Sequence, residues 1–507
     1  MRLSRSDHPS VNTTHARRWW ALVALMLPVL LVSIDNTVLA FALPEISEAL
    51  QPSGTELLWI VDVYPLVLAG LLVSMGSLGD RIGRRRLLLI GGTGFTLVSV
   101  LAAFMPNAAL LIAARALMGF FGAMLMPSTL SLIRNIFTDA TERRTAIAIW
   151  AAGFSGGAAL GPVVGGFLLE HFYWGSIFLM AIPVMLPLLV FGPVVIPESR
   201  DPHPGPVDPV SILLVLGTMT PLVYGIKQLA AAGLSPVPVA AIALSLALGT
   251  AFVRRQLGRE EPMLDVRLFQ RPVFSGAIGA NLLSVFSLVG FLYFVSQHLQ
   301  LVSGHSPMTA GLMLVPGMVV TIIAGLLVVK LAQRFQPAVI VTGGLLLNVV
   351  GYALIALTGG QGSDLGLLIA FMILGAGIGG AETISNDLIL SAVPAEKAGS
   401  ASAISETAYE TGAVLGTAVL GSILNLAYRT NLEVPEEVPA ELADSAGETL
   451  GNATRIAQEL GGGAGASLLE SAQHAFDSGV LITSLIGAAL MAAAAVLAWL
   501  TLREQKS

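Results

Sequence analysis

The chain has 507 residues, of which 55% are hydrophobic and only 11% are charged, and its mean hydropathy is +0.80. Soluble globular domains carry about 25% charged residues, so this composition excludes an ordinary soluble protein and indicates a membrane protein. The sequence contains no cysteine, which excludes disulfides, thiol chemistry and Cys-ligated metal sites. The net charge of −6 is modest, and the positions of the charges are more informative than their sum.

Apolar runs long enough to cross a bilayer recur along the whole chain. A membrane-spanning helix needs about 20 mostly apolar residues. The sequence predicts fourteen spans, at 19–44, 56–78, 87–105, 108–132, 145–168, 175–195, 209–228, 236–253, 272–297, 309–331, 337–357, 365–390, 399–427 and 478–502. The two runs at 209–228 and 236–253 are also compatible with a single re-entrant hairpin.

The basic residues are distributed unevenly between the loops. Of the 26 Lys and Arg residues, all but Arg115, Lys227, Arg429 and Arg455 fall at the chain ends or in every second loop. Because positive charge is retained in the cytoplasm, both termini are expected there. The first apolar run is too long for a signal peptide, so it is expected to be the first span.

The largest segment between spans is 429–477, which is rich in Glu and contains three consecutive glycines from Gly461. The alternation of basic loops places it outside the cell. We expect a plain connector, although its length exceeds what a connector needs and a functional lid is the alternative.

The turn after the second span combines glycines, one acid and several bases: Gly76-Ser-Leu-Gly79-Asp80-Arg81-Ile-Gly83-Arg84-Arg85-Arg86. Glycines permit a tight turn and close helix approach, and Asp80 can cap a helix or pair with the bases. This pattern resembles the signature that major facilitator superfamily proteins carry between their second and third helices.

Two further motifs lie inside spans. Arg115 is in the fourth span, where an arginine costs about 2.5–3.5 kcal/mol on insertion scales and is expected to face the protein interior. The fifth span carries a glycine ladder, Gly153, Gly157, Gly161, Gly165 and Gly166, with Pro162 inside it. Small residues allow two helices to pack backbone to backbone, and Pro162 weakens its helix locally. Together the motifs resemble those of the drug:proton antiporter branch, in which the glycine–proline motif is associated with export.

The stretches Ser33–Pro44 and Trp59–Tyr64 extend the resemblance to fourteen-helix drug:proton antiporters of the quaternary-ammonium and multidrug efflux type. The resemblance covers essentially the whole chain. It implies an all-α polytopic membrane protein in which two six-helix bundles flank two inserted helices. The expected domains are residues 1–200, residues 201–260 for the inserted helices, and residues 261–507.

Four acidic residues are expected inside spans: Asp35, Asp62, Glu406 and Glu410. Asp35 and Asp62 are predicted at similar depth, roughly 9–14 Å below the outer surface. Glu406 and Glu410 are four residues apart, so they share one helix face. Neighbouring carboxylates in an apolar wall cannot both ionise cheaply, so they can carry a proton and, once ionised, attract a cation.

Simpler interpretations of these residues remain open. Asp62 can be a helix cap or interface residue, and Glu406 can lie at the cytoplasmic rim. The resemblance implies that all four carboxylates match residues implicated in coupling and transport. Some relatives carry a further carboxylate on the tenth span, where this chain has Thr321. Monovalent rather than dicationic substrates are therefore expected.

Several further polar and aromatic residues lie inside the spans or at their ends. Lys227, Glu382 and Asp387 are expected to be boundary or interbundle contacts, and His298 an ordinary histidine at the outer surface. The candidate substrate-lining aromatics are Trp59, Tyr64, Phe286 and Tyr293, because aromatic faces attract cations.

The sequence thus predicts a multi-pass protein of the bacterial cell membrane that exports small cationic drugs in exchange for protons, acting as a monomer. The gating motifs are expected at Gly76, Asp80, Arg81, Gly83, Arg84, Arg115, Gly161 and Pro162. We expect no enzymatic activity, metal, cofactor or nucleic acid, because no catalytic constellation or phosphate loop is present. The alternatives are an exporter of an endogenous metabolite or amino acid, and a non-transporting sensor or lipid flippase partner.

Overall fold

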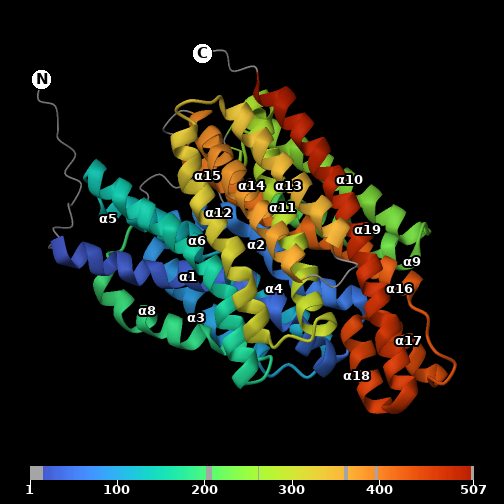
Figure 1. Ribbon diagram of the computed structural model, residues 1–507. Coiled ribbons are helices and arrows are strands. Elements are labelled where there is room, and N and C mark those ends of the chain that lie inside the picture. The colour runs from blue at the N-terminus through green and yellow to red at the C-terminus, as the bar shows by residue number, and fades with distance from the viewer. Residues whose placement is uncertain (1–14, 201–207, 261, 359–363, 394–397, 504–507) are drawn as a thin grey trace, which may run out of the picture.

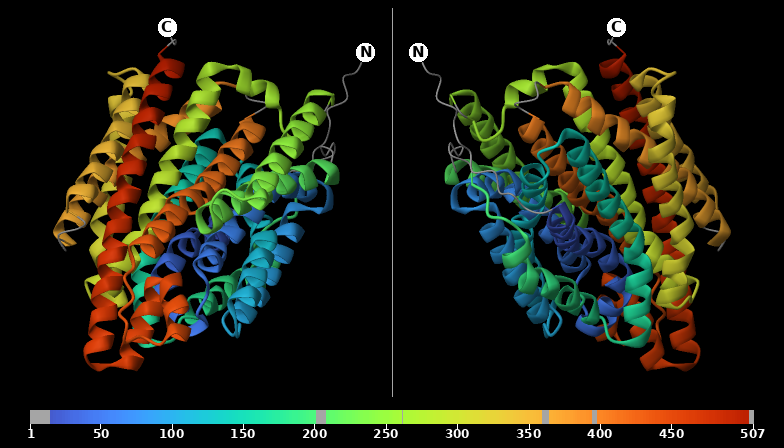
Figure 2. Two further views of the ribbon diagram at one scale, coloured as in Figure 1. Left: turned by 90° about the vertical axis from the view of Figure 1, so that its right-hand side faces the viewer. Right: turned by 90° about the vertical axis from the view of Figure 1, so that its left-hand side faces the viewer.

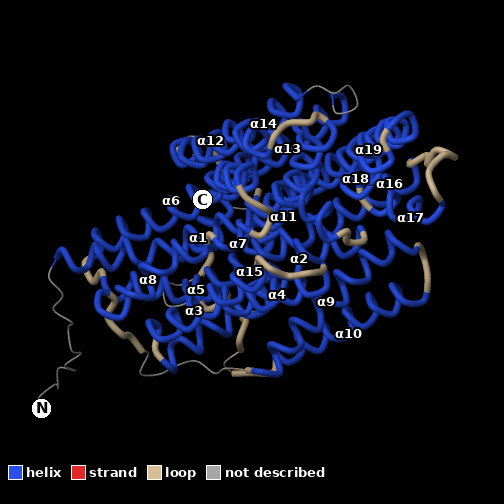
Figure 3. Tube along the Cα trace, turned by 90° about the horizontal axis from the view of Figure 1, so that it is seen from below, coloured by secondary structure: helices blue, strands red, loops and turns tan. Residues whose placement is uncertain are grey.

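The computed structural model describes residues 15–200, 208–260, 262–358, 364–393 and 398–503. This part of the chain is helical and contains no strand (Figure 3). It includes 14 spans that are long and apolar enough to cross a membrane, which confirms the predicted number and the all-α class. Four of the predicted cytoplasmic bases lie outside the described residues: Arg2, Arg5, Lys397 and Lys506.

The first six spans form one group of packed helices. The bounds are α1 (His15–Leu50), α2 (Gly54–Ile82), α3 (Arg84–Ala102), α4 (Ala108–Gly122), α5 (Leu125–Ile136), α6 (Ala140–His171), α7 (Ser176–Leu179) and α8 (Ala181–Val195). The fourth span is divided into α4 and α5, and the sixth into α7 and α8. Helix α1 packs against α6 and α8, and α2 packs against α4.

The last six spans form a second group. After a 3₁₀ turn (Val266–Gln270), the bounds are α11 (Pro272–Gln297), α12 (Pro307–Leu331), α13 (Pro337–Thr358), α14 (Asp364–Ser391), α15 (Ala398–Gly416), α16 (Ser422–Asn431) and α19 (Gly462–Leu502). Short π-helical stretches extend α11 (His298–Val302) and join α15 to α16 (Thr417–Gly421). Helix α13 packs against α14 and α19, and α11 packs against α15.

The inserted segment forms two full-length helices, α9 (Pro209–Ala232) and α10 (Pro236–Leu257), that pack against each other along one edge of the molecule (Figure 3). The alternative of a re-entrant hairpin is therefore wrong. Asp208 caps α9 and pairs with Arg255 and Arg259. Hydrogen bonds from Arg255 hold the pKa of Asp208 well below its usual value. Because α9 also contacts α2 and α16, the inserted pair touches both groups.

The two groups are close together at one end of the molecule and diverge toward the other (Figure 1). We call the end where α1 begins and α19 ends the terminal end. The opposite end, where α17 (Ala440–Glu448) and α18 (Leu450–Leu460) lie, is the loop end (Figures 1 and 2). The domain boundaries expected from the sequence, after residues 200 and 260, stay a prediction.

The segment 429–477 is mostly helical. It comprises the end of α16, all of α17 and α18, and the beginning of α19. Ser47 and Thr449 share a hydrogen bond of 2.7 Å between their hydroxyls, and the Gly54 N–H donates to Glu448 Oε2 at 2.9 Å. The segment leaves the second group and contacts the first, so it links the two groups at the loop end.

The glycine ladder of α6 packs closely against other helices, as the sequence predicts: its first four glycines face α1, and Gly166 faces Met308 of α12. A Cβ added to Gly157 would lie 2.9 Å from Ser33 Cβ and 3.2 Å from the Leu30 carbonyl oxygen, and one added to Gly161 would collide with Thr37 Oγ1. Helices approach this closely only where one of them lacks side chains. The ladder therefore sets the distance between α1 and α6.

Two adjacent glycines provide a matched test of this contact. We expect Gly157→Ala to destabilise the protein by about 1–3 kcal/mol, because the methyl group overpacks against α1. A Cβ at Gly156 would meet nothing within 4 Å. Gly156→Ala is therefore expected to be neutral or stabilising, since alanine favours helix by about 1 kcal/mol over glycine. Melting temperatures of the purified variants in detergent measure the difference, and equal values would contradict the ladder's role.

Candidate functional site

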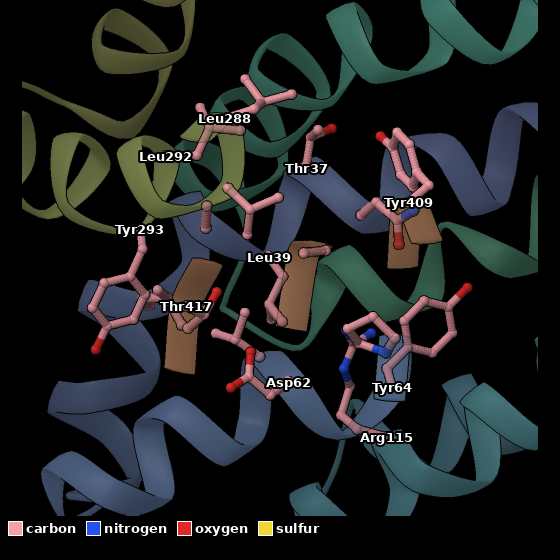
Figure 4. Close-up of a pocket in the computed structure, with 17 residues that line it drawn as sticks. Thr37, Leu39, Asp62, Tyr64, Arg115, Leu288, Leu292, Tyr293, Tyr409 and Thr417 are labelled. Atoms are coloured by element: carbon pink, nitrogen blue, oxygen red, sulfur yellow. The ribbon is translucent and has the colours of Figure 1, made fainter. Parts of the chain in front are cut away.

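A cavity lies between the two helix groups, mostly in the loop-end half of the spans. It is enclosed by α1, α2, α4, α11 and α15, and its volume is about 670 Å³ including the space through which it opens. Its walls are mostly apolar and aromatic, with a few polar groups that point inward (Figure 4). The lining residues are Asn36, Thr37, Leu39, Ala40, Leu43, Val61, Asp62, Tyr64, Pro65, Arg115, Leu288, Val289, Leu292, Tyr293, Tyr409, Ala413 and Thr417. We call this space the central cavity.

Arg115 and Asp35 form a buried ion pair at the edge of the central cavity. Arg115 Nη1 lies 2.7 Å from Asp35 Oδ2, and the two side chains are only 2% and 5% exposed. Arg115 also donates through Nε to the Ile60 carbonyl at 3.3 Å, and its guanidinium lies 4.6 Å from the centre of the Tyr64 ring. The expectation that this intramembrane arginine faces the interior is confirmed.

Asp62 and Lys227 form a second ion pair, and both side chains are fully buried. Lys227 Nζ lies 2.8 Å from Asp62 Oδ2 and 4.0 Å from the centre of the Trp59 ring. Of the two interpretations of Lys227, a contact between helix groups is confirmed, because this residue of α9 pairs with Asp62 of α2. Asp62 lies well inside α2, so its helix-cap alternative is wrong and its interface alternative holds. The sequence signal for Lys227 was its position at the end of an apolar run, away from the loops that hold the other bases.

Glu406 and Glu410 lie on α15, without a cation paired to either carboxylate in the described part of the chain. Glu410 is 3% exposed; it faces Asn36 of α1, and its Oε2 has no hydrogen-bond partner among the described residues. Glu382 of α14 lies close enough to Glu406 to interact with it electrostatically. Glu382 thus adds a third carboxylate to the predicted pair, although the sequence suggested a boundary or interbundle contact.

The candidate aromatics occupy different positions. Tyr64 and Tyr293 line the central cavity (Figure 4), and their contact with substrate stays a prediction. Trp59 contacts Lys227 instead, and Phe286 is buried where α11 meets Gly416, so neither is among the lining residues. Sequence analysis missed Tyr409, which lines the cavity, although its position next to Glu410 on α15 was a usable signal.

His298 is not an interfacial residue. It is 1% exposed, and its Nδ1 lies 3.0 Å from Asp477 Oδ1 of α19. The prediction is wrong because the helical extension of α11 turns this ring toward α19 rather than toward the surface.

The motif after α2 connects that helix to α3 and to the segment that follows α8. Arg84 Nη2 lies 2.6 Å from Asp80 Oδ1, so the pairing alternative for Asp80 holds. Glu198 accepts the Arg85 backbone N–H at 3.0 Å. Gly83 has φ +111°, and an added Cβ would lie 2.8 Å from the Glu198 carboxyl group, so glycine is required there. A Cβ on Gly76 would lie 3.7 Å from Pro127 on α5.

Within the described residues, no group of three or more His, Asp or Glu side chains is arranged to hold a metal ion. The described walls of the central cavity present buried charges, hydrogen-bonding groups and aromatic rings.

The fourteen-span fold, with buried charges around a central cavity, defines a multi-pass membrane protein. Residues 25–417 match the Major Facilitator Superfamily, and the chain belongs to this family. It is 56% identical over 496 residues to the multidrug efflux pump LfrA of Mycolicibacterium smegmatis, which covers 98% of each chain. It is 37% identical over 462 residues to the methyl viologen resistance protein SmvA of Salmonella typhimurium, covering 91% of this chain and 93% of SmvA.

Among solved structures, the fold resembles a bacterial homologue of the human lysosomal transporter Spinster, crystallised in an inward-facing and unoccupied conformation. The TM-score is 0.67 at 17% sequence identity, and the match covers 97% of this chain and 99% of the other. At this identity the likeness concerns the fold alone.

Proposed function

We propose that this protein is a proton-coupled antiporter of the bacterial cell membrane. It exports lipophilic, mainly monovalent cations such as quaternary ammonium compounds and dyes, with fluoroquinolones as further candidates. The observation that carries the proposal is a mostly apolar and aromatic cavity between two helix groups, with buried carboxylates in and beside its wall. Such a cavity suits an organic cation, because apolar surface binds its body and a carboxylate attracts its charge.

The ion pairs suggest different roles for the carboxylates. Asp35 and Asp62 each have a cationic partner, whereas Glu410 has none in the described part of the chain. Glu410 can therefore hold either a proton or the charge of a substrate. Competition between a cation and a proton for buried carboxylates is sufficient for exchange: a proton from outside expels the cation, and loss of the proton to the cytoplasm restores the negative charge. Each net inward charge contributes about 2.3 kcal/mol per 100 mV of membrane potential.

The orientation in the membrane is part of this proposal. The basic loops support a cytoplasmic terminal end, with α17 and α18 outside the cell. The diverging helices would then face the cytoplasm, from which a substrate would enter. The proposed domains are residues 1–200 and 261–507, joined by the inserted helices of 201–260, in line with the two packed groups.

The names of two relatives bear on the class of substrate that we propose. LfrA is named as a multidrug efflux pump, and SmvA is named for resistance to methyl viologen, which is a dication. The Thr321 hydroxyl donates to the Gly317 carbonyl at 3.0 Å and supplies no carboxylate on α12. A monovalent dye and methyl viologen therefore form an informative pair of test substrates.

Everted membrane vesicles that contain the protein test the proposal. Ethidium is expected to release protons from energised vesicles, and methyl viologen to do so weakly. Glu410→Gln should abolish the release, whereas Glu459→Gln, an exposed carboxylate on α18, should not affect it. No proton release with ethidium, or full release by Glu410→Gln, would contradict the mechanism. Competition by a zwitterionic amino acid instead of a cation would favour the metabolite exporter.

A further inference from the structure

The Asp62–Lys227 ion pair stands between two cavities. Asp62 lines the central cavity. Lys227 lines a second, smaller cavity toward the loop end, between α2, α9 and α16, whose volume is about 270 Å³ including the space through which it opens. We call it the loop-end cavity. Its polar lining comes from Thr55, Ser422, Asn425 and Arg429. The two charges are thus directly bonded to each other, yet each belongs to the wall of a different space.

The surroundings of the Lys227 ammonium are those of a site for an organic cation. A carboxylate lies 2.8 Å from Nζ, and the face of Trp59 lies 4.0 Å away. An anion combined with an aromatic face is the arrangement that attracts quaternary and other organic cations. We call Asp62 and Trp59 together the Asp62 subsite. The protein's own lysine occupies it in this structure.

The ion pair has few of the additional partners that stabilise a buried salt bridge. The Thr417 hydroxyl lies near Asp62, but neither the Asp62 oxygens nor Lys227 Nζ makes a hydrogen bond of good geometry with a described residue beyond their contact with each other. Buried ion pairs gain stability only when such bonds offset the loss of hydration. The loop-end cavity offers an alternative position for the ammonium, because the buried Ser422 hydroxyl in its wall has no partner among the described residues.

We propose that Lys227 is the resident cation of the Asp62 subsite, that a cationic substrate displaces it, and that it thereby sets the affinity and selectivity for cations. This inference rests on the proposed function. When a cation enters the central cavity and pairs with Asp62, the lysine side chain moves toward the loop-end cavity. A neutral molecule of the same shape has no charge with which to release Lys227, so the inserted helix α9 discriminates against it.

Ethidium binding to the purified full-length protein in lipid nanodiscs tests this inference. Lys227→Met removes the competing charge at similar length, and ethidium is expected to bind about tenfold more tightly. Lys227→Arg retains the ion pair, and its planar guanidinium binds a carboxylate more strongly, so ethidium should bind more weakly than to the wild type. Lys330→Met on α12 is the matched control and should not change the affinity.

The Arg variant decides the question if Lys227→Met does not fold, because it retains both charges. Folded Lys227→Met protein with unchanged or weaker binding, or Lys227→Arg protein with tighter binding, would overturn the inference. If the wild type binds ethidium but the affinities do not follow the order Lys227→Met above wild type above Lys227→Arg, only the role of Lys227 is overturned. A wild-type protein that binds no ethidium would overturn the cation specificity in the proposed function as well.

Discussion

Replacing Arg115 by methionine is expected to destabilise the protein by about 3–5 kcal/mol and to abolish transport. The substitution leaves the Asp35 carboxylate buried without the guanidinium that now lies 2.7 Å from it. It also removes the contact with the Tyr64 ring and the hydrogen bond to the Ile60 carbonyl, so α4 loses its polar connections to α1 and α2. The melting temperature of the purified protein and ethidium efflux from cells measure the two effects.

The double variant Asp35→Asn/Arg115→Met is the control for this prediction. It removes both charges, so no uncompensated charge remains buried, and most of the lost stability is expected to return. Transport should stay defective, because the double variant still lacks both charges at the edge of the central cavity. The ion pair would not hold α1 and α4 together if Arg115→Met had the melting temperature of the wild type. The same would follow if the double variant were less stable than Arg115→Met.

Spans were predictable because their signal is local. About 20 consecutive apolar residues suffice to recognise one, and the bases between spans fix their number. The ends were less predictable. The first span was expected to end at Pro44, yet α1 continues to Leu50. Proline lacks one backbone N–H, so it removes one helical hydrogen bond, and the turns that follow are held by packing against α18. The last span was expected from residue 478, but α19 begins at Gly462, since its first turns are helical without being apolar.

Partners of the buried charges were not predictable, because they depend on which helices become neighbours. Arg115 inside an apolar run indicated an interior position but did not identify Asp35. The Asp62–Lys227 pair requires α9 to pack on α2, and no local pattern encodes that contact. The same reason explains the misplaced His298, whose partner Asp477 comes from α19.

The close contact between α6 and α12 at the loop end joins the two helix groups where Gly311 meets Pro162. A Cβ added to Gly311 would collide with the Pro162 carbonyl, and one added to Gly166 would lie 2.6 Å from Met308 Cα. Backbone atoms cannot move aside as a flexible side chain does. A side chain at either glycine therefore forces the groups apart at this end.

Gly311→Ala is expected to disfavour the conformation closed at the loop end by about 1–3 kcal/mol. Because 1.4 kcal/mol corresponds to about a tenfold change in an equilibrium, the variant should populate loop-end-open molecules at least several-fold more often. The chain contains no cysteine, so a single Ala40→Cys substitution in the central cavity can report access without a prior cysteine-free background. In right-side-out vesicles, a membrane-impermeant maleimide should label this cysteine faster in the Gly311→Ala background.

Gly343→Ala on α13 is the matched control, because a Cβ there meets nothing within 4 Å. In the Gly343→Ala background, the maleimide should label the Ala40→Cys cysteine at the same rate as in the Ala40→Cys protein without a glycine substitution. Faster labelling in Gly311→Ala alone would show that the Gly311–Pro162 contact keeps the loop end closed and that this end faces outward. Equal rates in both backgrounds would mean that contacts such as Ser47–Thr449 and Gly54–Glu448 hold the groups together without it.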